Sequence, residues 1–130
     1  MDAPLLASLH NVGVTYGKRP VLHNICLEVR QGDFWTIIGP NGAGKSTLLG
    51  LFNGMTLACS GEVHYAGQKL GPKTLSGARL DIAHVFQATD LDPKMPLTVL
   101  DAVLGGTYAR LGLFKRPGQR EKALARQALD

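Results

Sequence analysis

The nine residues from Gly39 to Thr47 constrain this chain more than any other stretch of its sequence. They fit the pattern G-x-x-x-x-G-K-[ST], in which glycines let the backbone approach a ligand and N–H groups converge on phosphate oxygens at a helix N-terminus. We expect Lys45 to reach the β- and γ-phosphates of a nucleotide and the Ser46 hydroxyl to ligate Mg²⁺. The predicted phosphate-binding residues are Gly39, Pro40, Asn41, Gly42, Ala43, Gly44, Lys45, Ser46 and Thr47.

The sequence on either side of this loop has the pattern that a phosphate loop requires. Phe34 to Ile38 is a short apolar run that predicts a buried strand, and Leu48 to Phe52 predicts a helix. Asn53-Gly54 is a plausible C-cap for that helix. Strand, loop and helix in this order indicate a ligand-binding loop and not a Gly-rich turn without a ligand.

Composition sets broad limits on the chain. It has 130 residues, enough for one domain with a real core, and 45% of them are hydrophobic. No apolar run approaches the length of a membrane span, and the first residues do not resemble a secretory signal. We therefore expect a cytoplasmic location, unless a partner carries the chain to a membrane. Cys26 and Cys59 are predicted to be buried free thiols.

The net charge of +4 is unevenly distributed along the sequence. Six of the fourteen basic residues lie near the C-terminal end: Arg110, Lys115, Arg116, Arg120, Lys122 and Arg126. A nucleic-acid patch is conceivable, but few aromatic residues interleave with these charges. A solvated or membrane-proximal face is favoured over a nucleic-acid partner.

The rest of the chain alternates between predicted strands and helices. Leu5 to Tyr16, Ile25 to Val29 and Gly61 to Tyr65 show the alternation of antiparallel strands. Asp81 to Phe86 predicts a strand that returns to a parallel core and delivers Gln87 to its end. Thr98 is a predicted N-cap, with Asp101 three residues later in a variant of the capping box.

A further helix is predicted after Pro117. Its apolar stripe is Leu124, Ala125, Ala128 and Leu129, and on the preceding helix Val99, Val103 and Leu104 are expected to face inward. The last helix reaches Asp130 without a stop residue.

In this order, Tyr16, the loop Gly39 to Thr47, Gln87 and the helix pair after Thr98 resemble the nucleotide-binding subunit of ABC transporters. The resemblance covers essentially the whole chain, which corresponds to the N-terminal half of such a subunit. It implies an α/β fold: a P-loop NTPase core with an antiparallel β subdomain at residues 1–97, and the beginning of an ABC-type helical subdomain at 98–130, truncated before the signature motif.

The same resemblance implies the site and its ligands. Tyr16 would stack on the adenine of ATP, and Gln87 would bind Mg²⁺ or the attacking water and link the site to the helical subdomain. Ser46 and Gln87 would then be the Mg²⁺ ligands. The Walker B aspartate, the catalytic glutamate, the signature motif and the switch histidine of the family are absent, so no catalytic base is assigned. We expect ATPase activity of a complete subunit and negligible hydrolysis by these 130 residues alone.

The expected partners are a membrane permease, a second copy of the subunit in a head-to-tail dimer and a substrate-binding protein, on the inner face of the cell membrane. Residues 90–117 resemble the zinc, manganese and iron uptake branch, although Gly105-Gly106-Thr107-Tyr108 stands where that branch more often has Met-Gly-Arg-Tyr. Siderophore or haem import is the alternative. Two other classes stay open: a non-catalytic nucleotide-binding fragment, and a P-loop kinase or GTPase, which the missing Asn-Lys-x-Asp motif disfavours.

Overall fold

A computed structural model describes residues 3–85, 96–112 and 115–129 of the chain. It divides the chain into two units, Met1–His84 and Val85–Asp130. The boundary predicted between residues 97 and 98 lies inside the second unit, and the domain assignment stays a prediction. Each unit is described by itself.

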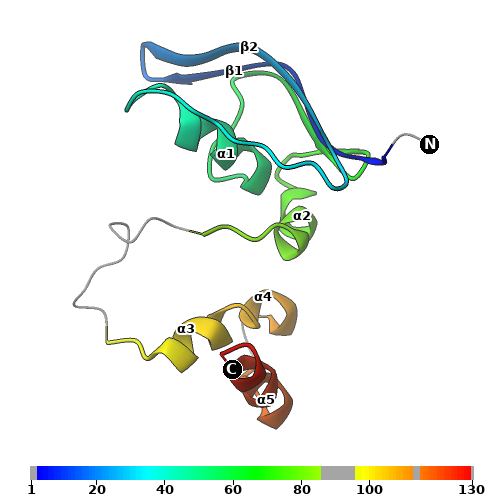
Figure 1. Cartoon of the computed structure of the whole chain (residues 1–130), viewed down its shortest axis with the longest axis vertical. Helices are drawn as coiled ribbons and strands as arrows, with labels where there is room; N and C mark the ends of the chain where they lie inside the picture. The colour runs from blue at the N-terminus through cyan, green and yellow to red at the C-terminus, as the bar shows by residue number, and fades with distance from the viewer. Residues whose placement is uncertain (1–2, 86–95, 113–114, 130) are drawn as a thin grey trace. The chain divides into compact units, whose positions relative to one another are not determined.

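The first unit is built on a four-stranded antiparallel sheet (Figure 1). Its strands are β1 (Leu5–Tyr16), β2 (Arg19–Arg30), β3 (Ser60–Tyr65) and β4 (Gln68–Lys69), in the order β2-β1-β3-β4. The three longer strands confirm the alternation found in the sequence. The long β1–β2 hairpin places the end of β1, at Tyr16, next to the start of β2, at Arg19.

The core lies on one face of this sheet. Leu9 and Val12 of β1 are both buried although they are three residues apart, because the register shifts between them. Asn11 has a positive φ of 50° at this irregularity, which is a β-bulge. The bulge keeps the apolar side chains on the same face, where Leu51 of helix α1 joins them in one cluster.

Helix α1 (Lys45–Asn53) confirms the helix predicted after the loop. It ends at Gly54, whose φ of 69° is the left-handed conformation of a glycine C-cap. Helix α2 (Leu75–Asp81) follows β4 (Figure 1).

The strand predicted at Phe34 to Ile38 is wrong for this structure. The segment is extended but forms no ladder, and the side chains of Phe34 and Ile38 are 93% and 90% exposed. Residues 82–85 of the second predicted strand also lack strand structure, and Val85 is exposed. The reason is that a strand is stabilised by its neighbours, and no described residues pair with either segment.

The predicted burial of the two cysteines is also wrong, since Cys26 and Cys59 are both exposed. Cys26 lies in β2 between the half-buried Ile25 and Leu27, and side chains alternate between the two faces of a strand. Its apolar neighbours in sequence therefore point to the opposite face.

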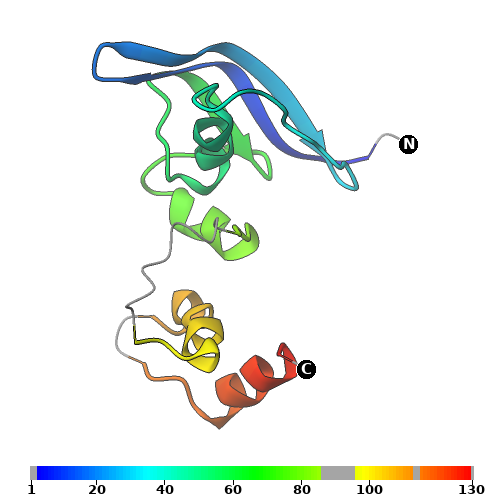
Figure 2. The ribbon, with the colours of Figure 1, turned by 60° about the vertical axis from the view of Figure 1, so that its left-hand side comes forward.

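The described residues of the second unit form three short helices: α3 (Val99–Gly105), α4 (Tyr108–Leu111) and α5 (Gln119–Gln127). Helices α3 and α5 pack together (Figure 2). Thr98 and Asp101 form the predicted capping box at the start of α3, and Ala125 of α5 is buried as expected. Val99, Leu124, Ala128 and Leu129 are exposed instead of buried. No helix in the described ranges is long and apolar enough to cross a membrane.

Candidate functional site

The predicted phosphate loop is an exposed turn between the extended segment and α1. Gly42 and Gly44 have positive φ angles of 80° and 92°. A Cβ atom at Gly44 would lie 3.0 Å from Leu22 Cδ2 and 3.1 Å from Val21 Cγ1, so the loop packs closely against β2 at this point. Only glycine meets both requirements at Gly44 without strain.

The N-terminus of α1 is open to an anion. Its N-cap is Gly44, which has no side chain to accept a hydrogen bond, and no acidic residue lies in its first turn. The first N–H groups of a helix have no intrahelical partner and carry the positive end of the helix dipole. These N–H groups are the donors that the sequence pattern assigns to phosphate oxygens, and that assignment stays a prediction.

Lys45, the first residue of α1, bends back over this loop. Its Nζ donates hydrogen bonds to the carbonyl oxygens of Gly39 at 2.9 Å and Pro40 at 2.8 Å. These bonds use two of the three N–H groups of the ammonium. They hold a positive charge against the two carbonyl oxygens at the start of the loop.

Mg²⁺ would fit one part of this site. Ser46 is exposed in the first turn of α1, and its hydroxyl is an oxygen ligand of the kind that Mg²⁺ prefers. No group of three or more His, Cys, Asp or Glu side chains in residues 3–85, 96–112 and 115–129 could hold a metal by itself. Mg²⁺ commonly binds through one or two protein ligands together with substrate phosphates and water, and Ser46 fits that arrangement. The second predicted ligand, Gln87, lies outside the described residues.

Tyr16 lies beside the start of α1, at the end of β1. Its hydroxyl is 3.4 Å from Thr56 Oγ1, and hydrogen bonds with Thr56 and then Thr47 hold the pKa of Tyr16 below its ordinary value. The side chain is 56% exposed. The structure thus brings Tyr16 and the last residue of the phosphate loop together, with the aromatic ring accessible.

Sequence reasoning missed the residues that support this arrangement. Thr56 is buried, and its N–H donates to the carbonyl oxygen of Gly50 at 2.9 Å. A Cβ at Gly50 would lie 2.5 Å from Thr56 Oγ1, which explains a glycine in the interior of α1. Glycine is unfavourable inside a helix, so Gly50 was the signal in the sequence that another residue approaches α1 closely at this point.

The C-terminal end of α1 is held by a side chain from α2. Arg79 donates from Nε to the carbonyl oxygen of Asn53 at 2.9 Å and from Nη2 to that of Gly54 at 3.1 Å. A cation at this end is favourable because the last carbonyls of a helix lack partners and carry partial negative charge. Both ends of α1 are therefore fixed by specific contacts.

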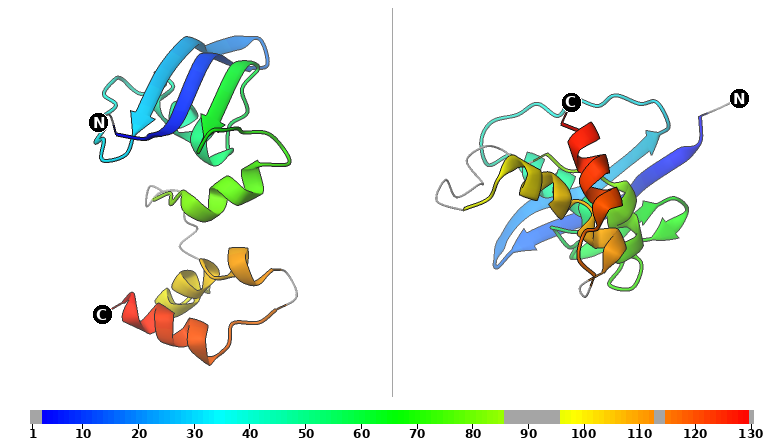
Figure 3. Two further views of the ribbon diagram at one scale, coloured as in Figure 1. Left: turned by 90° about the vertical axis from the view of Figure 1, so that its right-hand side faces the viewer. Right: turned by 90° about the horizontal axis from the view of Figure 1, so that it is seen from below.

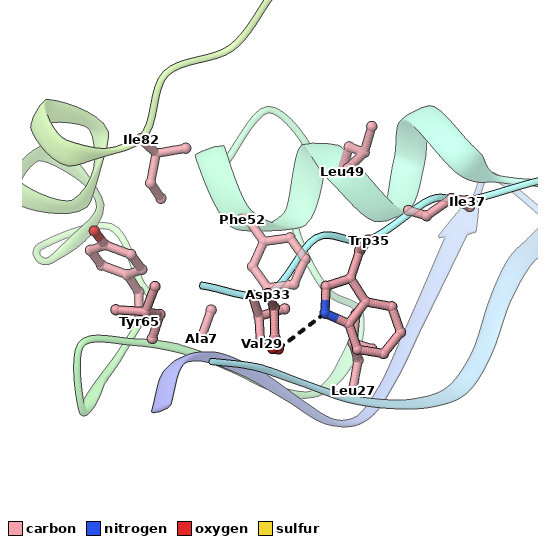
Figure 4. A pocket seen from close by; sticks show the side chains of 11 residues that line it. Ala7, Leu27, Val29, Asp33, Trp35, Ile37, Leu49, Phe52, Tyr65 and Ile82 are labelled. Carbon is pink, nitrogen blue, oxygen red and sulfur yellow. Dashed lines mark hydrogen bonds between the residues drawn. The ribbon is translucent and has the colours of Figure 1, made fainter. Parts of the chain in front are cut away.

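This unit also has an apolar hollow, whose lining includes no residue of the phosphate loop. Its volume is about 330 Å³, and Leu27, Val29, Trp35 and Phe52 line it between the sheet, the extended segment and α1 (Figure 4). The one carboxylate there, Asp33, accepts a hydrogen bond from Trp35 Nε1 at 3.2 Å. Such a lining does not suit a triphosphate, so the loop remains the candidate site for one.

Comparison with known sequences finds relatives along most of the chain. Residues 22–129 match the family described as ABC transporter. The chain is 41% identical over 122 residues to the manganese transport system ATP-binding protein MntB of Listeria monocytogenes, covering 94% of this chain and 49% of MntB. It is 43% identical over 117 residues to the zinc transport system ATP-binding protein TroB of Treponema pallidum, covering 90% of this chain and 42% of TroB. The chain thus spans about half the length of these relatives.

Solved structures show the same fold. A dimeric structure of MJ0796, a bacterial ABC transporter cassette, matches with a TM-score of 0.78 and 31% identity, over 95% of this chain and 56% of that one. A post-hydrolysis state of the same cassette, bound to ADP and Pi, matches with a TM-score of 0.76 and 30% identity, over 95% of this chain and 56% of that one. The fold class predicted from the sequence, the first part of a P-loop NTPase of the ABC type, is confirmed.

Proposed function

The chain belongs to the ABC transporter family as part of an ATP-binding subunit, and we propose that its loop Gly39–Thr47 holds the triphosphate of ATP. The observation that carries this proposal is the uncapped N-terminus of α1, with the Lys45 ammonium bonded across the loop. An anion with several oxygens would use the N–H groups and Lys45 together.

We assign the remaining site residues on the same basis. The Tyr16 ring is exposed, and its hydroxyl is hydrogen-bonded to Thr47 at the end of the phosphate loop. A base stacked on this ring would belong to the nucleotide whose phosphates occupy the loop. Ser46 would hold Mg²⁺, which neutralises phosphate charge when it is bound. Gln87 completes the proposal as a ligand of Mg²⁺ or water.

The proposed role of the complete subunit is to couple ATP binding and hydrolysis to import of a metal ion. Manganese and zinc are favoured because MntB and TroB are named for transport of these metals. A siderophore or haem complex is the alternative cargo. The proposed domains are a nucleotide-binding core at 1–97 and the beginning of a helical subdomain at 98–130.

The proposed partners follow from the family. They are a membrane permease, a substrate-binding protein, and a second copy of the subunit, as in the dimeric structure of MJ0796. The subunit would then lie at the inner face of the membrane. Residues 1–130 by themselves would bind nucleotide and hydrolyse it negligibly, because phosphoryl transfer depends on positioning and charge stabilisation and the family's Walker B aspartate and catalytic glutamate are absent from their sequence.

Calorimetric titration of the 130-residue chain with ATP and with inorganic tripolyphosphate tests the site. Lys45→Ala removes the charge over the loop, so it should weaken binding of both ligands at least tenfold. Tyr16→Ala should weaken ATP roughly tenfold, since stacking on an aromatic contributes about 1–3 kcal/mol per base, and leave tripolyphosphate unchanged.

Tyr16→Phe is the matched control, because it keeps the ring and removes only the hydroxyl, and it should keep the affinity for ATP. Unchanged ATP binding by Lys45→Ala would overturn the assignment of the loop. Equal loss of both ligands in Tyr16→Ala would overturn the stacking role.

A further inference from the structure

The extended segment before the phosphate loop has the composition of a strand but no strand partner. Residues 34–38 are Phe-Trp-Thr-Ile-Ile, a stretch without a charge, a glycine or a proline. They belong to no ladder, and within the described ranges no residue forms a hydrogen bond with their backbone groups. Unpaired N–H and C=O groups along an extended apolar stretch are a template for another strand. These five residues are called the open edge below.

The two edges of the four-stranded sheet differ from the open edge in charge or in length. Strand β2 forms one edge and carries Arg19, Glu28 and Arg30, and β4 at the other edge is two residues long (Figure 3). Charged side chains and short strands are features by which native sheets avoid pairing with other chains. The open edge has neither feature, so we expect association there and not at the edges of the sheet.

The side chains of the open edge lie on two faces. Trp35 and Ile37 line the apolar hollow, whereas Phe34 and Ile38 are almost fully exposed (Figure 4). Successive side chains of an extended chain point to opposite faces, so Thr36 shares the outer face with Phe34 and Ile38. A partner strand would therefore meet apolar side chains on both faces.

The open edge is complementary to a second copy of itself. In an antiparallel pair centred on Thr36, each residue meets the one at the mirror position of the second copy: Phe34 meets Ile38, and Trp35 meets Ile37. This register keeps the exposed side chains together on one face and the side chains from the hollow together on the other. Pairs of aromatic and β-branched residues stabilise antiparallel strands, and a two-fold pair is closed, as most homodimers are.

We propose that the open edge pairs with the open edge of a second copy of this chain, in antiparallel register about Thr36. The pair supplies ladder hydrogen bonds to the backbone of residues 34–38 and covers the side chains of Phe34 and Ile38. The contact is small, so dimers form in the micromolar to millimolar range of concentration. No nucleotide takes part in this contact, and the inference stands apart from the dimer proposed above.

Sedimentation equilibrium of the 130-residue chain without nucleotide tests this inference. The mass should rise from one chain to two as the concentration rises. Fluorescence should shift to the blue in parallel, because Trp35 is the single tryptophan and pairing covers its exposed side chain. Monomers at every concentration would assign the open edge to a different strand and overturn the proposal. Association without a change in fluorescence, or growth beyond two chains, would overturn it as well.

Thr36→Lys and Thr36→Glu test the register of the pair. Each variant by itself places two like charges opposite one another at the centre, so the association constant should fall about fivefold or more. An equal mixture of the two variants places opposite charges there and should restore association, which also shows that neither variant is misfolded. A mixture that stays monomeric would overturn the proposed register and the proposal with it.

Gln68→Lys is the matched control for added charge. Gln68 is exposed in β4, at one edge of the four-stranded sheet, and the substitution changes the net charge by as much as Thr36→Lys does. This variant should associate as the unmodified chain does. A loss equal to that of Thr36→Lys would mean that net charge, and not strand pairing at the open edge, sets the association, and would overturn the proposal.

Discussion

The hydroxyl of Tyr16 lies 3.4 Å from Oγ1 of Thr56, across forty residues of sequence. Thr56 is buried at the end of the turn that follows α1, and Tyr16 ends β1. The contact therefore connects the sheet to the helix that begins at the phosphate loop. A hydrogen bond with Thr47, in the first turn of α1, also lowers the pKa of Tyr16, so this pKa responds to the placement of that helix.

Replacing Thr56 by Val should raise the pKa of Tyr16 toward its ordinary value, because Thr56 is the largest cause of its lowered pKa. With a lowered folded-state pKa, the chain gains stability as pH rises from that pKa through the ordinary value of 10.0. The Thr56→Val variant should lose part of this gain in stability. The pKa of Tyr16 is measured from tyrosinate absorbance against pH, after the absorbance of a Tyr16→Phe variant is subtracted to remove the other tyrosines. Thr36→Val, in the exposed extended segment, should leave the titration unchanged, and an unchanged titration of Thr56→Val would refute the contact.

Gly42 and Gly44 form a matched pair for testing how the loop is anchored. Both have positive φ, so Ala at either position should cost about 1–2 kcal/mol in left-handed strain. A Cβ at Gly42 meets nothing within 4 Å, whereas one at Gly44 crowds Val21 and Leu22. Gly44→Ala should therefore lose about 1–3 kcal/mol more in urea unfolding than Gly42→Ala. Equal losses would mean that packing on β2 does not hold the loop.

Arg79 should stabilise the first unit by closing the C-terminal end of α1. Arg79→Ala should lower the free energy of unfolding by about 1–2 kcal/mol, because two carbonyl oxygens lose a charged donor. Arg79→Lys should recover only part of this, since an ammonium lacks the planar fork. Thermal or urea unfolding measures both variants. Lys73→Ala, an exposed cation shortly before α2, should change little; a loss equal to that of Arg79→Ala would contradict the capping role.

Acid should weaken the start of α3. Hydrogen bonds from the Thr98 side chain and then its backbone hold the pKa of Asp101 below its ordinary value of 3.8. Their stabilisation is present above that value and is lost as pH falls through the folded-state pKa. Thr98→Ala should raise the pKa of Asp101, measured by NMR of its carboxyl carbon. Thr107→Ala removes a hydroxyl near the other end of α3 and should leave Asp101 unchanged; a shift there of equal size would count against the capping box.

Features set by local chemistry were predictable from the sequence. The Gly44 to Thr47 turn into a helix, the Gly54 C-cap and the Thr98–Asp101 capping box each depend on a few neighbouring residues. The long strand Leu5–Tyr16 was also predictable, because its alternating side chains lie on a half-buried sheet.

Features that depend on partners distant in the sequence could not be predicted. Phe34 to Ile38 has the composition of a strand, but pairing requires a neighbouring strand, and the described residues offer none. No spacing rule connects Tyr16 with Thr56, or Arg79 with the carbonyl oxygen of Asn53 to which it donates a hydrogen bond. The roles proposed for Tyr16, Ser46 and Gln87 remain predictions, and Gln87 lies outside the described residues.

The extended segment that leads into the phosphate loop gives the site a property beyond ligand chemistry. At Gly44 the loop is fixed against β2, but at Gly39 it continues from residues that no described strand supports. The described contacts on that side are the hydrogen bonds from Lys45 Nζ to the carbonyl oxygens of Gly39 and Pro40. A phosphate that draws Lys45 toward itself competes with these bonds, and the cost of breaking them lowers its affinity. A strand paired with Phe34 to Ile38 would support Gly39 independently of Lys45, so phosphate affinity at this loop reports on the strand neighbours of that segment.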